Sequence, residues 1–310
     1  MQKTNPVPLK TSIVIPCYNA ALFVEQAIIS CVKEGVPESN IIVIDDGSSD
    51  KTPEVLARYD GKIRVHRQKN SGASIARNVG LSMVQTPYMI FFDADDLYEG
   101  GIISALEEEM IRAGADIGFG PMQDFGPDSR YGRRTLPPEP SNPNTFLEAW
   151  LAGHTVQTNS HIWRTAFLKQ IGGYPENMRT LEEIEVVARG ILAGATLATT
   201  HVGQSLYINR GNPNRVSTGN SSEVIRSAIN GFIALAPLLR TDGQRRALGR
   251  RFYLQSRSAF RQGYKDIGSQ ALALARANGF HGHIGSRSHK LLSRLLGLER
   301  KVLWFETERS

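Results

Sequence analysis

Short apolar runs separated by polar turns dominate the first third of the chain. Each run is rich in β-branched or aromatic side chains and is bounded by turn-forming residues, which is typical of buried strands. The runs span residues 11–16, 40–45, 63–67 and 88–93. Between the first two, residues 21–34 carry apolar side chains at helical spacing: Val24, Ala27, Ile28, Cys31 and Val32. Strands that alternate with helices predict an α/β fold with a mostly parallel sheet flanked by helices.

The pattern changes after residue 120. Residues 121–143 are rich in Pro and also contain Gly, Ser, Asn and Asp, so we predict a loop there. Residues 143–210 mix helical patterns with short strands, the last of them at 205–209, and the pattern is helical from about residue 220 onward. The sequence therefore predicts a helical C-terminal part that follows a part built around a sheet.

Composition narrows the range of partners only a little. The 310 residues carry a formal net charge of +6, which favours an acidic partner such as a diphosphate, an anionic lipid surface or nucleic acid. Cys17 and Cys31 lack the spacing of a metal site or a disulfide framework, so we expect two buried thiols in a reducing compartment. No apolar stretch has the length of a signal peptide or a membrane span, and we expect a cytoplasmic protein.

Acidic side chains follow the predicted strands at the edge where an open parallel sheet binds its ligands. The first strand leads into PCYN at residues 16–19, the second into DDGS at 45–48 and the fourth into DADD at 93–96. Turn and helix-cap roles explain each acid singly, but gathered carboxylates without lysines would repel one another unless a cation joined them. We therefore predict a Mg²⁺ or Mn²⁺ site whose coordination a diphosphate substrate completes.

Two common phosphate-binding loops are absent from the sequence. No G-x-G-x-x-G follows the first predicted strand, and there is no P-loop lysine motif. These absences count against dinucleotide-dependent dehydrogenases and P-loop ATPases.

Five segments in fixed order resemble the family 2 inverting glycosyltransferases. They are SIVIPCYNA, IIVIDDGSSD, NSGASIARNVGL, FFDADD, and IGGY followed by LEEIE, and the resemblance covers roughly residues 10–215. It implies a GT-A fold with a Rossmann-like sheet over residues 1–215. In that arrangement residues 10–120 bind a nucleotide-sugar, residues 121–215 face the acceptor, and residues 216–310 form a helical C-terminal extension.

The resemblance also implies where the nucleotide binds. Pro16, Tyr18 and Asn19 would line the nucleoside pocket, and Asp46 would accept a hydrogen bond from the base, which suits N3–H of uracil or thymine. Arg77, in the ARN segment, would offset the charge of the diphosphate. Arg210 is a further candidate contact to the diphosphate.

Asp93 and Asp95 match the outer positions of the D-x-D motif of the family. The resemblance implies that Asp95 binds the metal and that Asp93 binds the ribose or a metal-bound water, with Asp96 as an additional contributor. The metal would neutralise charge that develops on the departing nucleoside diphosphate. Asn212 stands where relatives often have a histidine, so a third protein ligand is left unassigned, and the nearby His201 is more simply a structural residue.

Transfer also requires a base that takes the proton of the acceptor hydroxyl. The family presents Glu-Asp for this purpose, whereas the corresponding residues here are Glu182 and Glu183. Glu183 occupies the aspartate position and is one methylene longer, and Glu182 is the reserve candidate. An acidic first turn that complements the helix dipole is the structural alternative for both residues.

The C-terminal part is basic and amphipathic. Arg250, Arg257 and Arg261 fall near one helical face, and residues 291–303 place apolar side chains beside lysine and arginine. A solvated face is the default interpretation of the three arginines, whereas the composition of residues 291–303 suits a helix on the inner face of an anionic membrane. Packing against the catalytic domain or a second subunit of a homo-oligomer is the alternative.

Together these observations predict a metal-dependent inverting transferase. It would move a sugar from a UDP-sugar, or from a dTDP-sugar, to a saccharide or lipid-linked saccharide in cell-surface polysaccharide or glycolipid synthesis. A non-catalytic nucleotide-sugar-binding or scaffold protein of the same fold is the alternative. Nucleic-acid binding is not expected, because no recognised motif accompanies the basic charge.

Overall fold

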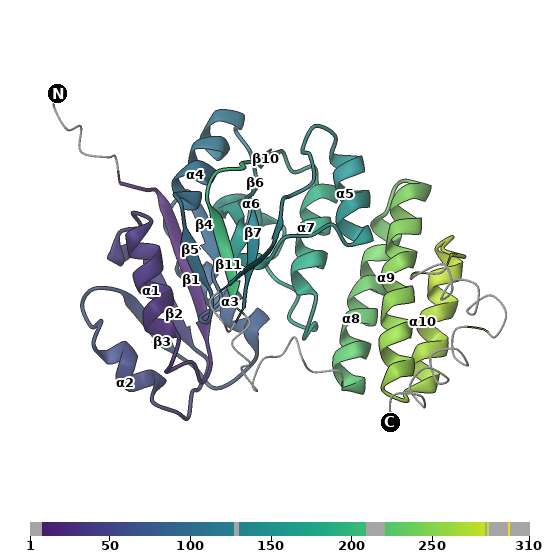
Figure 1. The fold of residues 1–310 in the computed structure, drawn as a ribbon, viewed down its shortest axis with the longest axis horizontal. Coiled ribbons are helices and arrows are strands. Elements are labelled where there is room, and N and C mark those ends of the chain that lie inside the picture. Colours follow the sequence, from purple (N-terminus) through teal and green to yellow (C-terminus); the bar gives the residue numbers. More distant parts are fainter. Residues whose placement is uncertain (1–7, 127–129, 209–220, 283, 285–296, 298–310) are drawn as a thin grey trace. The chain divides into compact units, whose positions relative to one another are not determined.

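The computed structural model describes residues 8–126, 130–208, 221–282, 284 and 297 (Figure 1). The chain divides into two compact units. The first comprises residues 1–143, 155–176 and 193–214, and the second comprises residues 144–154, 177–192 and 215–310.

A seven-stranded sheet forms the centre of the first unit. Its strands lie in the order β10-β6-β9-β4-β1-β2-β3, and β9 alone runs antiparallel to its neighbours in this sheet. The bounds are β1 Thr11–Cys17, β2 Ile41–Asp45, β3 Arg64–Arg67, β4 Tyr88–Phe91, β6 Ile117–Phe119, β9 His161–Arg164 and β10 Leu197–Thr199. The four strands predicted in the first third of the chain, and the mostly parallel sheet, are confirmed.

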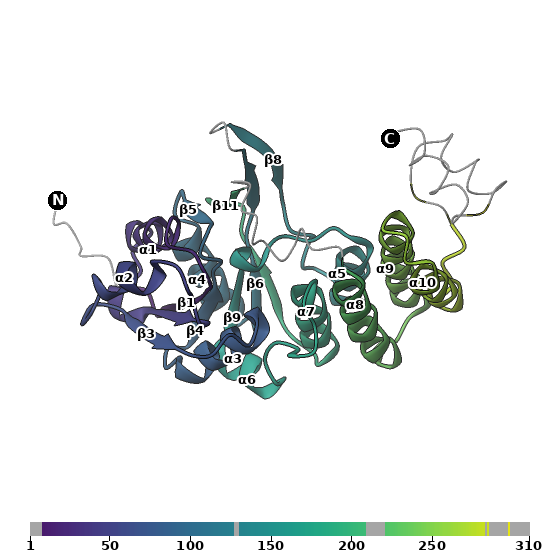
Figure 2. The same ribbon diagram turned by 90° about the horizontal axis from the view of Figure 1, so that it is seen from below.

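Helices cover both faces of this sheet (Figure 2). One face packs against α1 (Val24–Lys33) and α4 (Ile102–Ala113), whose apolar side chains share a core with Ile13 and Ile15 of β1. The other face packs against α3 (Ala73–Met83), where a Cβ on Gly80 would lie 2.2 Å from Cγ1 of Val14. Successive residues of β1 are therefore buried on opposite faces, which explains its unbroken run of apolar side chains.

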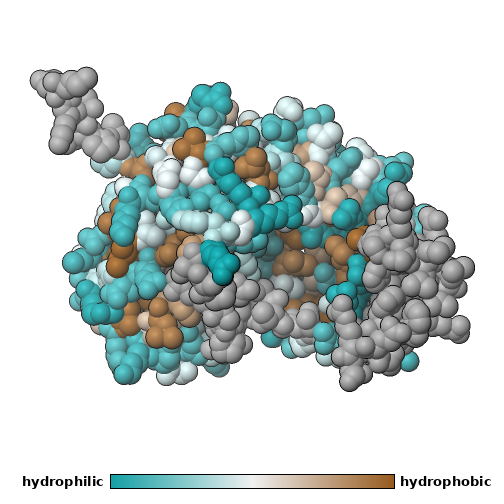
Figure 3. All heavy atoms as spheres, in the orientation of Figure 1, coloured by the Kyte–Doolittle hydropathy of each residue, from teal (hydrophilic) through white to brown (hydrophobic). Residues whose placement is uncertain are grey.

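The remaining described helices of the first unit are short. They are η1 (Glu38–Asn40), α2 (Thr52–Ala57), η2 (Thr158–Ser160) and α6 (Thr165–Gln170). The predicted helix over residues 21–34 is confirmed as α1. Cys17 and Cys31 are free and buried, as expected, and burial raises the pKa of both thiols well above its ordinary value. Figure 3 shows apolar side chains scattered among hydrophilic ones on the visible surface of this unit.

A second sheet corrects the loop predicted over residues 121–143. Its order is β5-β11-β7-β8, with bounds β5 Leu97–Glu99, β7 Met122–Phe125, β8 Tyr131–Thr135 and β11 Gln204–Ile208. β7 pairs antiparallel with β8 and parallel with β11. The side chains of β8 are mostly exposed, so these strands lack the hydrophobic signal that revealed the core strands. The prediction of a loop was wrong for β7 and β8, whereas the strand predicted at 205–209 is confirmed as β11.

The second unit is built from helices. It contains α5 (Pro143–Ala152), α7 (Glu182–Leu192), α8 (Ser222–Leu235), η4 (Ala236–Leu238), α9 (Asp242–Arg261) and α10 (Lys265–Ala277). Thr241 and Gln244 form a capping box at the start of α9, which stabilises that helix end. The helical pattern predicted beyond residue 220 is confirmed over the described residues. Among them, no helix is long and apolar enough to cross a membrane.

Candidate functional site

The loops that follow β1, β2 and β4 lie along one edge of the main sheet. β1 pairs with β2 so that Cys17 lies beside Asp45, and the amide of Asp46 donates to the carbonyl of Cys17 at 2.8 Å. On its other side β1 pairs in parallel with β4, so the segment that begins at Phe92 leaves the sheet at the same edge. The predicted gathering of the three acidic or polar loops at the carboxyl ends of the strands is confirmed.

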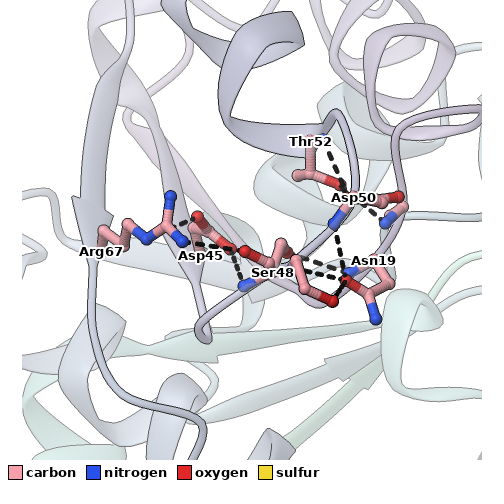
Figure 4. Close-up of polar contacts among 8 residues, drawn as sticks. Asn19, Asp45, Ser48, Asp50, Thr52 and Arg67 are labelled. Atoms are coloured by element: carbon pink, nitrogen blue, oxygen red, sulfur yellow. Dashed lines mark hydrogen bonds and ion pairs between the residues drawn. The ribbon is translucent and has the colours of Figure 1, made fainter.

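Asn19 locks the loop after β1 to the loop after β2 (Figure 4). Its amide donates to Oγ of Ser48 at 2.9 Å, and its Oδ1 accepts a hydrogen bond from the amide of Ser49 at 2.8 Å. Asn19 has a φ of 50°, a left-handed conformation that Asn tolerates better than most residues. The structure thus gives Asn19 a role in shaping the site, while its contact with a nucleoside stays a prediction.

Asp50 stabilises the end of the loop after β2, where α2 begins. Its Oδ1 accepts hydrogen bonds from the amide of Thr52 at 2.9 Å and from the hydroxyl of Thr52 at 2.5 Å. Partial burial acts to raise the pKa of Asp50, but the hydrogen bonds from Thr52 and from the amide of Ala21 outweigh it, and the pKa is lowered. The loop is therefore held by an ionised carboxylate at neutral pH.

Asp45 and Arg67 add an ion pair that the sequence did not single out. Asp45 is buried, accepts a hydrogen bond from the amide of Ser48 at 2.9 Å, and lies 3.5 Å from Nε of Arg67. Nη2 of Arg67 also donates to the carbonyl of Ser48 at 2.8 Å, as Figure 4 shows. Arg67 ends β3 and is exposed, so its place at the end of a predicted strand was the signal that could have indicated it.

Asp46 anchors the segment that precedes α3. Its Oδ1 accepts hydrogen bonds from Nε2 of Gln68 at 2.8 Å and from the amide of Ser71 at 2.9 Å, and its Oδ2 accepts one from the amide of Gly72 at 2.8 Å. Only 3% of Asp46 is exposed. A carboxylate oxygen can accept two hydrogen bonds, so Oδ2 keeps capacity for a further donor. The predicted contact with a base N3–H stays a prediction.

Gly47 allows this segment to approach the loop after β2. Its φ is 77°, and a Cβ at this position would lie 2.8 Å from the amide nitrogen of Asn70. Gly61 has a similar φ of 71°, but a Cβ there would meet no other atom within 4 Å. Substitution of either glycine would strain the backbone, but only at Gly47 would the new side chain also clash with a neighbouring atom.

We expect Gly47→Ala to destabilise the protein more than Gly61→Ala does. Left-handed strain alone should lower the free energy of unfolding of Gly61→Ala by about 1 kcal/mol. The added clash with the backbone of Asn70 should raise the loss for Gly47→Ala to about 3 kcal/mol. Urea unfolding of both variants measures the difference, and equal losses would show that residues 68–70 move aside at no cost.

Arg77 and Asp93 form an ion pair at the end of β4. Nη2 of Arg77 lies 3.0 Å from Oδ1 of Asp93, and 6% of the arginine side chain and 32% of the aspartate side chain are exposed. Asp95 is half-buried, and Ala94 between the two acids is buried. The pair places a cationic group beside the half-exposed carboxylates, which is where a bound diphosphate would need it.

Asp96 differs from its two acidic neighbours because the structure holds it in the core. It is 1% exposed. Its Oδ2 accepts a hydrogen bond from Nδ2 of Asn159 at 2.9 Å, and its Oδ1 accepts one from the amide of Ile208 at 2.9 Å. Both oxygens thus join the D-x-D segment to η2 and to the end of β11. We therefore leave Asp96 out of the metal site that was predicted to include it.

Asp93 and Asp95 fit a metal ion that binds few protein ligands. Over the described residues, no group of three or more His, Cys, Asp or Glu side chains gathers closely enough to hold an ion. Mg²⁺ and Mn²⁺ commonly use one or two carboxylates and take the rest of their ligands from water and substrate phosphates. Two half-exposed carboxylates at the edge of the sheet suit that donor set, and the metal ligands stay a prediction.

Glu182 and Glu183 lie in the first turn of α7, in the second unit. Both are half-buried, whereas Glu185 is buried and paired with Arg189 at 2.8 Å. The sequence did not single out Arg251 of α9, which is 8% exposed and donates to the carbonyls of Trp150 and Leu151.

The charge of Glu183 acts on this buried arginine. Burial lowers the pKa of Arg251 to about 10, and the negative charge of Glu183 opposes that lowering. Neither glutamate is thereby shown to act as a base, and both assignments stay predictions.

Several predicted features fall elsewhere. Arg210, Asn212 and the side chains of the amphipathic stripe over residues 291–303 lie outside the described residues. His201 is exposed, and its carbonyl accepts a hydrogen bond from Nη2 of Arg134 at 2.9 Å.

Of the three arginines predicted on one helical face, Arg261 is exposed, while Arg250 and Arg257 are half-buried in α9. Tyr18 is 46% exposed and Pro16 is half-buried, so the pocket predicted for both residues stays a prediction.

The chain is similar in sequence to known glycosyltransferases. The family model of glycosyl transferase family 2 matches residues 12–169, which is more than half of the chain. The glycosyltransferase EpsJ of Bacillus subtilis is 28% identical over 225 residues, which cover 68% of this chain and 63% of EpsJ. The cholesterol galactosyltransferase of Borreliella burgdorferi is 32% identical over 144 residues, which cover 46% of this chain and 40% of that protein. The chain thus spans less than two thirds of the length of these curated relatives.

A solved structure shares the fold over almost the whole chain. S. aureus TarS 1-349 in complex with UDP-GlcNAc aligns with a TM-score of 0.71 and 17% sequence identity. The alignment covers 97% of this chain and 92% of the TarS chain. At this level of identity the likeness concerns the arrangement of the elements.

Proposed function

Because the chain belongs to glycosyl transferase family 2, we propose that it transfers a sugar from a nucleoside diphosphate to an acceptor hydroxyl with inversion. The observation that carries this proposal is the group formed by Arg77, Asp93 and Asp95 at the carboxyl edge of the sheet. One cationic and two anionic side chains at a strand edge suit a metal–diphosphate ligand. A UDP-sugar is the proposed donor, and the UDP-GlcNAc complex of TarS supports that class of molecule.

In the donor site each residue has a distinct proposed task. Asp46 faces the base through the remaining capacity of Oδ2, and Tyr18 offers its exposed ring to the nucleoside. Asp95 would hold Mg²⁺ or Mn²⁺, with Asp93 beside it. When bound, the metal supplies positive charge that stabilises the leaving diphosphate. Arg77 adds a fixed positive charge from the protein to the same group.

The acceptor is proposed to lose its proton to Glu183. Inversion requires the hydroxyl to attack from the face opposite the departing diphosphate, so the base must be a group separate from the metal-binding aspartates. A saccharide or lipid-linked saccharide is the proposed acceptor class. The cholesterol galactosyltransferase among the relatives supports a lipid acceptor, and a basic tail at a cytoplasmic membrane surface would suit one.

Release of nucleoside diphosphate from a panel of UDP-, dTDP-, GDP- and CDP-sugars tests the proposal. With Mn²⁺ and a mixture of candidate saccharide and lipid acceptors, we expect the wild type to release UDP, or dTDP, at least about 100-fold faster than Asp95→Ala does. Binding of a nucleotide-sugar without release would favour the non-catalytic alternative. Release of GDP or CDP alone would show that the assignment of the base pocket is wrong.

A further inference from the structure

The segment Gly172-Gly173-Tyr174 is clamped to the helix that carries Arg77. The side chain of Asn78, the next residue in α3, binds both backbone groups of Tyr174. Its Oδ1 accepts from the amide of Tyr174 at 2.8 Å, and its Nδ2 donates to the carbonyl of Tyr174 at 3.0 Å. Nδ2 also donates to Oε1 of Glu176 at 3.0 Å. A paired contact of this kind fixes the backbone of Tyr174 relative to α3.

Gly173 leaves the space that the hydrogen bonds between Asn78 and Tyr174 require. Its φ is 68°, and a Cβ at this position would lie 2.5 Å from Oδ1 of Asn78. Any larger residue would therefore push away the oxygen that accepts from Tyr174. The glycine and the asparagine belong to two separate motifs of the sequence, and the structure joins them in one contact.

The ring of Tyr174 contacts both a core aromatic residue and the guanidinium of Arg77. The edge-to-face contact with Phe91 has a centroid distance of 4.9 Å and an interplanar angle of 76°. The Cζ atom of Arg77 lies 5.0 Å from the centroid of the tyrosine ring. Tyr174 is 2% exposed and Arg77 is 5% exposed, so both partners are shielded from water. A cation over an aromatic face is more strongly stabilised when it is desolvated in this way.

Arg77 therefore contacts both Asp93 and Tyr174, which lie in different segments of the chain. Its Nη2 reaches Asp93 at 3.0 Å, and its guanidinium also rests on the Tyr174 ring. A buried guanidinium is costly unless its surroundings compensate the charge. The ring compensates part of that charge. Nη2 of the same guanidinium is directed toward Asp93 at the edge of the sheet.

We propose that Tyr174 is a positioning residue that holds the guanidinium of Arg77 toward the diphosphate of the donor. The hydrogen bonds from Asn78 fix the position of the Tyr174 backbone relative to α3. The ring of Tyr174 in turn fixes the orientation of the Arg77 guanidinium. Its effect on catalysis rests on the proposed function, since it requires Arg77 to contact a diphosphate. The contribution is pre-organisation, which improves ligand affinity by reducing the ordering that binding demands.

Calorimetric titration with UDP in the presence of Mn²⁺ tests this role in four proteins. They are the wild type, Tyr174→Phe, Tyr174→Leu and Arg77→Met. We expect Tyr174→Phe to bind within about two-fold of the wild type, and Tyr174→Leu to bind about ten-fold more weakly, because only leucine removes the aromatic face. In transfer assays the loss should appear in the KM for the donor rather than in kcat. A merely structural role would lower the free energy of unfolding of Tyr174→Leu but leave the UDP affinity of the folded variant unchanged.

The double variant Arg77→Met/Tyr174→Leu provides the decisive comparison. If the ring acts through the arginine, the double variant binds UDP no more weakly than Arg77→Met alone. Fully additive losses would overturn the proposal. Should Tyr174→Leu fail to fold, 3,4,5-trifluorophenylalanine at position 174 keeps the ring shape and weakens its negative face. UDP affinity unchanged by that residue would equally overturn the proposal.

The same variants separate this inference from the proposed function. If the wild type binds no nucleotide, the proposed function fails, but the coupling between Arg77 and Tyr174 can still be read from the free energy of unfolding in urea. Non-additive destabilisation there would preserve the contact as a positioning device for Arg77. Additive values would contradict the inference whatever the protein binds.

Discussion

Glu183→Gln is expected to lower kcat for sugar transfer by about 1,000-fold while UDP affinity stays within about two-fold of the wild type. The amide has nearly the shape of the carboxylate but cannot take a proton from the acceptor hydroxyl. Glu183 is half-buried in the first turn of α7, and the substitution removes only its capacity to accept the proton. The loss should therefore fall on the chemical step. Steady-state transfer kinetics together with UDP titration measures the two quantities separately.

Two matched variants identify which glutamate serves as the base. Glu182→Gln lies one position earlier in the same turn and should retain most of the activity. Glu183→Asp restores the residue type that the family presents, so any activity it shows reports how much reach matters at this position. Loss of transfer in Glu182→Gln but not in Glu183→Gln would move the assignment to Glu182. Full activity in both glutamine variants would remove this turn from the mechanism.

Asp95→Asn is expected to weaken Mn²⁺-dependent binding of UDP by about 100-fold or more. The substitution keeps the size of the side chain and removes the negative charge that a hard divalent cation requires. Because Asp95 is half-buried at the edge of the sheet, the fold should tolerate the amide. The measurement is UDP titration at several Mn²⁺ concentrations, with binding in EDTA as the baseline.

Asp96→Asn is the matched control one residue away. Both oxygens of Asp96 accept hydrogen bonds in the core, from Asn159 and from the amide of Ile208. Asparagine offers one acceptor in place of two, so we expect a loss of about 1–3 kcal/mol in the free energy of unfolding. Metal-dependent UDP affinity of the folded variant should change little. The reverse pattern, with Asp96→Asn losing metal dependence and Asp95→Asn keeping it, would exchange the two assignments.

The core of the fold was predictable because its signal is local. Strands such as Ile41–Asp45 are buried on both faces and read as unbroken apolar runs. The alternation of strands with helices then implies a parallel sheet whose carboxyl ends meet at one edge. β7 and β8 were missed for the opposite reason, since the side chains of β8 are mostly exposed. Pairing with neighbouring strands, which no local pattern records, gives these residues their extended conformation.

Some residues of the candidate site could likewise be predicted from local sequence, whereas the contacts between them could not. Residues that stand at strand ends, such as Asp46 and Asp93, could be predicted from the sequence, although their hydrogen-bond partners could not. The different burial of Asp95 and Asp96 depends on Asn159, which is far away in the sequence. The contact between Tyr174 and Arg77 likewise joins segments that are almost a hundred residues apart in the sequence. Such contacts arise from tertiary packing, which spacing within one motif does not reveal.

Binding of nucleotides is the most direct test of the donor site proposed at this edge of the sheet. Wild-type protein is titrated calorimetrically with UDP, dTDP, GDP and CDP, each in Mn²⁺, in Mg²⁺ and in EDTA. The proposal predicts that UDP or dTDP binds in the presence of a divalent cation, that EDTA weakens this binding, and that GDP and CDP bind at least about ten-fold more weakly. Absence of binding by every nucleotide under all three conditions would contradict the assignment of a nucleotide-sugar donor site to these residues.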